Sequence, residues 1–284
     1  MWGPYRVNHA VTTLRAVLLG APGEELRDLS RPGDWLMLEA PDLPRLQAQA
    51  EGLAAAYAAE GVEVVWHRPQ GPHVPPNHIF AADLFFMTSE GAILARMAAE
   101  QRAGEERLAA QALSALGVPI LLTPRGDATF EGADAAWLDP RTVLLGVGQR
   151  TNGAAVEQVA PLLASMGVEV RVAELAGGVQ HLLGAVNFVD GDLAVVRASQ
   201  LTPSLRDALR GWNLVELPDD DEVLGRRAMN FVTLGPRAVL LPTECPRTRA
   251  RLEAHGVRVV EAAVTEYVKA GGGMGCATGI LWRG

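Results

Sequence analysis

The chain alternates between helix-like stretches that end in glycine and short, Val-rich apolar runs. Glycine readily adopts the left-handed backbone conformation that closes a helix, and the β-branched run after it favours a strand. We therefore predict five helices that end at glycine, each followed directly by a strand. These segments lie at residues 55–67, 112–122, 162–172, 205–217 and 251–262.

A second apolar run precedes each predicted helix, so that each unit is strand, helix, strand. The glycines that mark the units are separated by 56, 50, 44 and 45 residues. One such unit is common in any protein that alternates strands and helices, but five at near-even spacing indicate a repeat architecture. We predict a single α/β domain over residues 1–284, with five units closed into a ring. A central site would then draw its residues from several units.

Composition narrows the function classes. The 284 residues are 49% hydrophobic and 20% charged, and their net charge is -8, which favours a large core and argues against a nucleic-acid surface. An acidic protein suits a small cationic substrate, although many acidic proteins have none. Two cysteines are too few for a disulfide scaffold or a cysteine-based zinc site. Because no apolar run approaches 18 residues and the N-terminus lacks a signal-like apolar segment, we expect a cytoplasmic protein without a membrane partner.

Cys276 is the candidate nucleophile, because it lies in the glycine-rich stretch GGGMGCATG. Glycines permit unusual backbone angles there and leave backbone N–H groups near the thiol, which would raise the thiolate population. The alternative is a flexible loop with an incidental cysteine. Cys245 follows a strand-like run and is expected to be structural.

A nucleophilic cysteine needs a proton-transfer partner, and His181 in GGVQHLLGAVNF is the best candidate among six histidines. A guanidinium substrate would also need carboxylates, which match its planar N–H donors. Glu131, Asp134 and Asp83 each stand beside a strand-like run, where they could also be turn or helix caps. The acidic run 219–222 is expected to be a solvated loop.

Arg102 and Arg150 follow strands at equivalent points of two units. Each could hold a substrate carboxylate or pair with a helix acid.

Five short stretches make the chain resemble the dimethylargininase (dimethylarginine dimethylaminohydrolase) branch of the guanidino-group-modifying superfamily. The resemblance runs from about Pro76 to Leu281. The family's pentein-like fold, a pseudo-fivefold α/β propeller, agrees with the five units above. The stretches are FEGAD at 130–134, GQRTN at 148–152, QHL at 180–182, CPRTR at 245–249 and EYVKAGGGMGC at 266–276.

The resemblance implies that Cys276 is the nucleophile and His181 the general acid and base. It implies that Asp83 and Glu131 hold and polarise the guanidinium. It also matches the arginines at 102 and 150 to positions that bind an amino-acid carboxylate. The implied mechanism passes through a covalent thiouronium on the cysteine and needs no metal or organic cofactor.

Two departures bear on the substrate. Deiminases and amidinotransferases carry an acid two residues after the histidine, where this chain has Leu183, which favours the dimethylargininase branch. Asn77 stands where that branch has an acid, which resembles the arginine dihydrolases, enzymes that carry hydrolysis past the ureido stage. One fewer carboxylate would weaken the grip on a cation and favour a neutral ureido or amide group.

We therefore predict a cysteine-dependent hydrolase of a guanidino compound that gives a ureido product. The alternatives are an arginine deiminase or dihydrolase or another ureido hydrolase, then an amidinotransferase, then a non-catalytic binding protein of the same fold. The expected partner is a small guanidino or ureido molecule and not a nucleic acid. The sequence leaves open which guanidino or ureido molecule is the substrate and whether the protein forms a homodimer.

Overall fold

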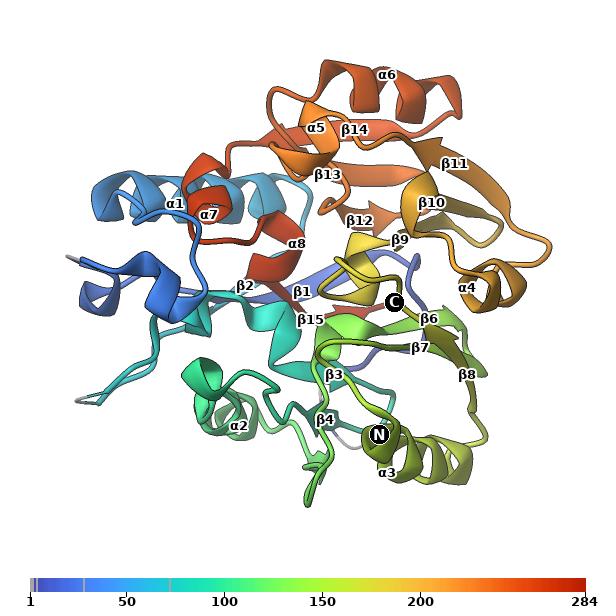
Figure 1. The fold of residues 1–284 in the computed structure, drawn as a ribbon, viewed down its shortest axis with the longest axis horizontal. Coiled ribbons are helices and arrows are strands. Elements are labelled where there is room, and N and C mark those ends of the chain that lie inside the picture. Colours follow the sequence, from blue (N-terminus) through green and yellow to red (C-terminus); the bar gives the residue numbers. More distant parts are fainter. Residues whose placement is uncertain (1–2, 4, 28, 72) are drawn as a thin grey trace.

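The computed structural model describes residues 3, 5–27, 29–71 and 73–284. The predicted domain of residues 1–284 also includes positions 1, 2, 4, 28 and 72, which lie outside the described residues. The described chain forms five three-stranded sheets arranged around a centre, with helices on the outside (Figure 1). The predicted pseudo-fivefold α/β propeller is therefore confirmed.

Fifteen strands build the five sheets. Their bounds are β1 (Leu14–Gly20), β2 (Glu63–His67), β3 (Phe85–Met87), β4 (Ala92–Leu94), β5 (Ile120–Leu122), β6 (Ala135–Asp139), β7 (Thr142–Val147), β8 (Glu169–Glu174), β9 (Val186–Asp190), β10 (Leu193–Arg197), β11 (Asn213–Leu217), β12 (Val232–Gly235), β13 (Ala238–Pro242), β14 (Arg258–Ala262) and β15 (Thr278–Arg283).

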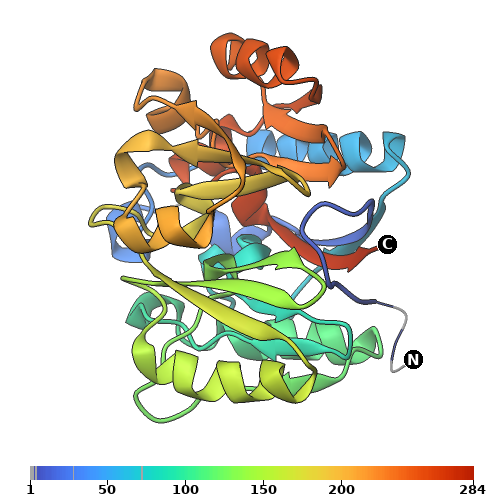
Figure 2. The ribbon, with the colours of Figure 1, turned by 90° about the vertical axis from the view of Figure 1, so that its right-hand side faces the viewer.

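Five α-helices cover the outside of the ring, and three short ones lie in loops (Figures 1 and 2). Their bounds are α1 (Leu43–Ala59), α2 (Glu105–Ala115), α3 (Gly153–Ser165), α4 (Pro203–Ala208), α5 (Asp221–Leu224), α6 (Pro246–Ala254), α7 (Thr265–Lys269) and α8 (Met274–Ala277).

Each unit has the same order of pairing. A middle strand pairs in parallel with the strand that follows the covering helix, as β7 does with β8 across α3. The same middle strand pairs antiparallel with a third strand on its other side, as β7 does with β6. The sequence pattern predicted the parallel pair and the helix but missed this third strand. The first unit takes its third strand, β15, from the C-terminus, so that β15 pairs with β1 and joins the two ends of the chain.

The glycines that mark the units have the predicted conformation. All five lie in the left-handed region, with φ of 74, 73, 75, 90 and 73° at Gly61, Gly117, Gly167, Gly211 and Gly256. Each follows one of the covering helices and precedes the outer strand of its sheet. The left-handed turn lets the chain leave the helix and return along the sheet.

The hydrophobic core lies between the helices and the sheets rather than at the centre of the ring. On α1, for example, Leu46, Leu53 and Tyr57 are fully buried, and they pack with strand residues such as Val17 and Leu19. No helix in the described part of the chain is long and apolar enough to cross a membrane. The loops that enter the third strands add apolar side chains such as Phe80 and Met274 to this core, and they also carry buried polar groups.

Candidate active site

Five polar side chains stand at equivalent places in the five units, shortly before the third strand of each sheet. Asp83 precedes β3, Glu131 precedes β6, His181 precedes β9, Asn230 precedes β12 and Cys276 precedes β15. They are separated by 48, 50, 49 and 46 residues. Since the third strands lie innermost in the ring (Figure 1), the repeat brings these distant residues to one place. Asn230 was missed by the sequence reasoning, although this spacing of about 50 residues would have found it.

A cavity of about 280 Å³ opens at this place. Asp83, His181, Asn230 and Cys276 all line it, while Glu131 is fully buried behind the imidazole of His181. The structure therefore brings the predicted nucleophile, proton carrier and carboxylates together. The other polar and charged residues of the lining are Asn77, Gln180, Arg102, Arg197 and Arg227.

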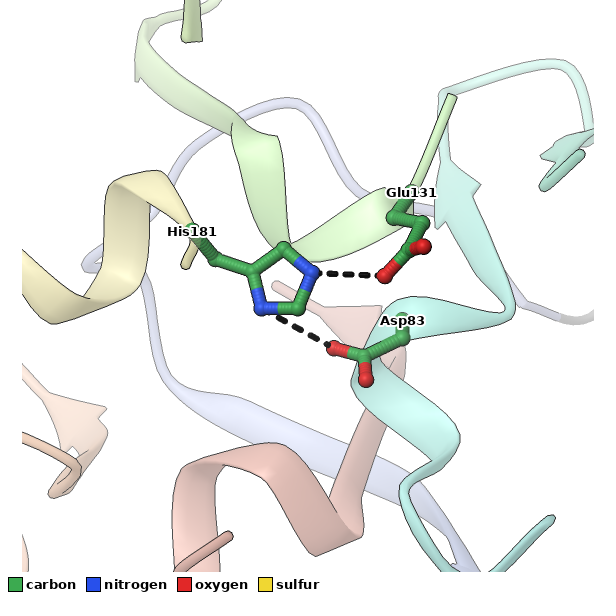
Figure 3. A group of neighbouring side chains, drawn as sticks. All are labelled: Asp83, Glu131 and His181. Carbon is green, nitrogen blue, oxygen red and sulfur yellow. Dashed lines mark hydrogen bonds and ion pairs between the residues drawn. The ribbon is translucent and has the colours of Figure 1, made fainter. Parts of the chain in front are cut away.

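The imidazole of His181 is held between two carboxylates (Figure 3). Nε2 lies 2.6 Å from Glu131 Oε2, and Nδ1 lies 3.8 Å from Asp83 Oδ1. Burial alone would lower the pKa of His181, but Asp83, the bond to Glu131 and the charge of Asp134 outweigh it and raise that pKa to about 9. At neutral pH His181 is therefore an imidazolium that can donate a proton.

Arg102 is engaged by buried acids. Its Nη1 lies 2.6 Å from Asp83 Oδ2, and its Nη2 lies 2.7 Å from Glu105 Oε2 in α2. The predicted alternative, a pair with a helix acid, therefore describes its contacts in this structure. Since breaking a buried ion pair by removing one partner typically costs about 3–5 kcal/mol, this group has a clear structural role.

Two residues predicted to contact substrate do not line the cavity. Asp134 is fully buried, and its Oδ1 accepts the N–H of Leu182 at 2.9 Å, so it orients the segment that carries His181. Arg150 Nη1 lies 3.9 Å from Glu131 Oε1, on the side of that carboxylate away from the bond to the imidazole. A role of either residue in binding substrate stays a prediction, and in this structure both contact the groups that surround His181.

The cavity retains free acceptor atoms. Asp83 Oδ1 is buried without a hydrogen-bond partner, whereas Asp83 Oδ2 accepts from Arg102. The amide nitrogen of Asn77 donates to the carbonyl of Trp35 at 2.7 Å, which leaves its amide oxygen as the unengaged end. A carboxylate oxygen and an amide oxygen can therefore meet N–H groups of a bound molecule.

Two hydrogen bonds join Cys276 to the side-chain amide of Asn230. Its backbone N–H donates to Asn230 Oδ1 at 2.9 Å, and Asn230 Nδ2 lies 3.2 Å from Sγ. Burial and the charge of Asp83 raise the pKa of the thiol to about 11, against the opposing effects of Gly273, Asn230 and Arg227. The resting sulfur is therefore a neutral thiol at neutral pH. Cys245, by contrast, is buried at the start of α6, as expected for a structural residue.

The glycines beside Cys276 serve mainly to permit close packing. Only Gly271, with φ of 94°, has the unusual backbone angle that the sequence suggested for the run. A Cβ on Gly272 would lie 2.3 Å from the ring of Phe80, and one on Gly273 would lie 2.6 Å from Asn230 Oδ1. Larger residues would therefore push α8 away from its neighbours.

Arg227 is a cation on the cavity lining that sequence reasoning did not identify. Its Nε is buried without a hydrogen-bond partner, and no salt bridge among the described residues involves it. The other partly exposed arginine of the lining, Arg197, pairs with Asp219 at 2.5 Å. Arg227 is thus the charge in the lining that is available to an anionic group.

Asp83, Glu131 and His181 also have the spacing of a metal site, with one ligand atom each within 4.8 Å of the others. However, Arg102 Nη1 lies 2.6 Å from Asp83 Oδ2 and 3.8 Å from Glu131 Oε2. A divalent cation there would be repelled by the buried guanidinium. The group therefore suits proton chemistry better than metal binding.

The acidic run at 219–222 is only partly the solvated loop that the sequence suggested, because Asp219 and Asp221 are exposed whereas Glu222 is buried. Asp220 caps α5 and accepts from the N–H groups of Glu222 and Val223. Glu222 is buried, and its carboxylate accepts from the backbone N–H groups of Arg247 and Thr248 at the start of α6. Helix N-termini favour such acids because their N–H groups lack partners.

Comparisons with known proteins agree with this arrangement. The model of the arginine deiminase family matches residues 73–201. An uncharacterized protein of Aeropyrum pernix is 32% identical over 204 residues, which cover 71% of this chain and 72% of that protein. The N(G),N(G)-dimethylarginine dimethylaminohydrolase of Pseudomonas aeruginosa is 25% identical over 201 residues, which cover 71% and 75% of the two chains.

The fold has solved counterparts. The structure of a mutant of the Pseudomonas aeruginosa dimethylarginine dimethylaminohydrolase complexed with citrulline has a TM-score of 0.76 at 22% identity. The match covers 96% of this chain and 100% of that chain.

Proposed function

Because the chain belongs to the guanidino-group-modifying superfamily and is similar to dimethylarginine dimethylaminohydrolases, we propose that it hydrolyses a C–N bond of a guanidino compound through Cys276. The observation that carries the proposal is the meeting of Cys276, His181 and Asp83 on one cavity, with Glu131 bonded to the imidazole. A thiol, a proton carrier and carboxylates are the groups that this reaction requires.

Substrate binding begins at the carboxylate. The free Oδ1 of Asp83 accepts an N–H of the guanidino group, and the amide oxygen of Asn77 accepts another. The cation stabilises a negative charge on the nearby sulfur and so offsets the burial that raises the pKa of the Cys276 thiol to about 11. Substrate binding and activation of the nucleophile are in this way coupled.

The reaction proceeds in two halves. When the substrate binds, the Cys276 thiol releases its proton to solvent, and the resulting thiolate attacks the guanidino carbon. The imidazolium of His181 gives its proton to the departing amine, which leaves a covalent thiouronium. His181, now neutral, takes a proton from water as the water attacks the same carbon. The carbon–sulfur bond then breaks to release the thiolate and the ureido product. Glu131 keeps the imidazole oriented and stabilises its charged form throughout.

A second candidate is hydrolysis that starts from, or continues to, a neutral ureido group. Among the described residues that line the cavity, Asp83 is the one carboxylate, and it lies beside the neutral amide of Asn77. This pair binds a cationic group less strongly than two carboxylates would. An arginine dihydrolase or ureido hydrolase would fit that balance of charge.

The test is a substrate screen read by mass spectrometry. Arginine, methylated arginines, citrulline and agmatine are offered separately to the purified protein. Dimethylamine indicates a dimethylargininase, ammonia alone a deiminase, and ammonia with carbon dioxide a dihydrolase. Protein denatured during turnover should carry an adduct on Cys276 and none on Cys245.

Two matched variants control the screen. Cys276→Ser should abolish turnover, while Cys245→Ser should retain it, because the thiol of Cys245 is buried outside the cavity. Full activity in Cys276→Ser would refute the covalent mechanism.

A further inference from the structure

Asn230 completes the ring of five residues that precede the third strands, and its amide contacts the reacting sulfur. We propose that Asn230 is a catalytic residue of this enzyme, which holds the sulfur of Cys276 as a hydrogen-bond acceptor and stabilises it as a thiolate during attack. The inference rests on the proposed function for its role in turnover. Its effect on the sulfur itself can be measured without any substrate.

The orientation of the amide follows from the backbone. The N–H of Cys276 can only donate, so the atom of Asn230 that lies 2.9 Å from it must be the oxygen. The nitrogen of the same amide is thereby turned toward Sγ, at 3.2 Å. Asn230 can only donate to the sulfur, and a donated N–H bond is stronger to a thiolate than to a thiol.

The position of Asn230 is itself tightly set. The backbone N–H of Gly275 donates to the carbonyl of Asn230 at 2.9 Å. Added Cβ atoms on Gly273 and Gly275 would lie 2.6 and 3.1 Å from Asn230 Oδ1, so both glycines allow α8 to close over the amide. Gly273 and Gly275 of the glycine-rich stretch therefore leave the space that this side chain occupies.

The other groups that act on the sulfur are known. Asp83 disfavours the thiolate, whereas Arg227 and a backbone hydrogen bond from Gly273 favour it. The imidazolium of His181 lines the same cavity. Because these groups stay in place when Asn230 is changed, a shift in the titration of the thiol reports on the amide.

The experiment measures alkylation of Cys276 by iodoacetamide from about pH 7 to beyond the thiol pKa of about 11, read by mass spectrometry on the full chain. In Asn230→Ala the rate at neutral pH should fall about 10- to 100-fold, which is the usual effect of one hydrogen bond to a charged group. In Asn230→Asp the oxygen still accepts from the Cys276 N–H, but the second oxygen repels the thiolate. The profile should therefore move to higher pH in both variants, and further in the aspartate variant.

Asn187 provides the matched control. Its amide donates to the carbonyl of Phe231, the residue after Asn230, at 2.8 Å, and it does not contact the sulfur. Asn187→Ala should lose similar stability yet keep the wild-type alkylation profile. Steady-state kinetics with a substrate from the screen should show a lower kcat in the two Asn230 variants, with a smaller change in KM.

Wild-type alkylation profiles in both Asn230 variants would overturn the inference, even if their turnover were lost. Should the alanine variant fail to fold, an unshifted profile in the isosteric aspartate variant would still overturn the inference. If the wild-type protein turned over no guanidino or ureido compound, the proposed function would fail, but a shifted alkylation profile would still establish the effect of Asn230 on the thiol.

Discussion

Replacement of Glu131 by glutamine should lower the pKa of His181 and move the pH dependence of both stability and activity. The substituted amide cannot turn freely, because the backbone N–H of Ala98 donates to Glu131 Oε1 at 3.2 Å and needs an oxygen there. The amide nitrogen must then face His181 Nε2, where it donates to a neutral imidazole and disfavours the imidazolium. The negative charge 2.6 Å from Nε2 is lost at the same time.

In the wild-type protein, the contribution of His181 protonation to the free energy of unfolding follows from its pKa. This pKa is about 9 in the folded protein, against an ordinary value of 6.5. A difference of about 2.5 units corresponds to about 3 kcal/mol. Since the folded pKa is raised, this stability is fully present below about pH 6.5 and is lost as the pH rises through about 9. For a chain of this size the loss amounts to about 6 °C in Tm. In Glu131→Gln the loss of stability with rising pH should be smaller and should occur at lower pH.

The assay combines thermal melting from about pH 6 to 10, an NMR titration of the imidazole, and kcat against pH. In wild type, kcat should decline as His181 loses its proton near pH 9, and in Glu131→Gln the decline should begin at lower pH. Glu90→Gln, at an exposed loop position, is the control and should behave as wild type. An unchanged titration of His181 in Glu131→Gln would refute the reasoning.

Three further outcomes are expected. Arg227→Gln should raise KM for arginine about tenfold or more in steady-state assays but leave agmatine, which lacks a carboxylate, nearly unchanged; equal effects on both would contradict a role in binding an anion. Asn77→Asp should improve KM for arginine relative to citrulline, because it adds a charge to the cavity. Gly132→Ala should cost about 1–3 kcal/mol in urea unfolding, since the new Cβ would lie 2.1 Å from the carbonyl oxygen of Phe85; Gly33→Ala, in open space, is its control.

The repeat architecture and two chemical groups could be inferred from the sequence because each depends on local features. The left-handed φ of a glycine such as Gly61 and the helix and strand on either side of it involve only neighbouring residues. The five units, together with the resemblance to a family of ring-shaped proteins, then predict that Cys276 and His181 lie at the centre. The third strands were missed because they lie outside the strand–helix–glycine–strand pattern by which the units were recognised.

Only the tertiary structure decided which charged and polar groups pair with one another. Arg102 pairs with Asp83 across 19 residues, and Asn230 reaches Cys276 across 46. Such contacts depend on closure of the ring and on burial, since a charge in the interior must find a partner there while an exposed one need not. The sequence therefore determined the five units and pointed to the candidate nucleophile. Only the folded ring determined that Arg102 is occupied, that Asp134 supports the histidine segment, and that Asn230 contacts the sulfur.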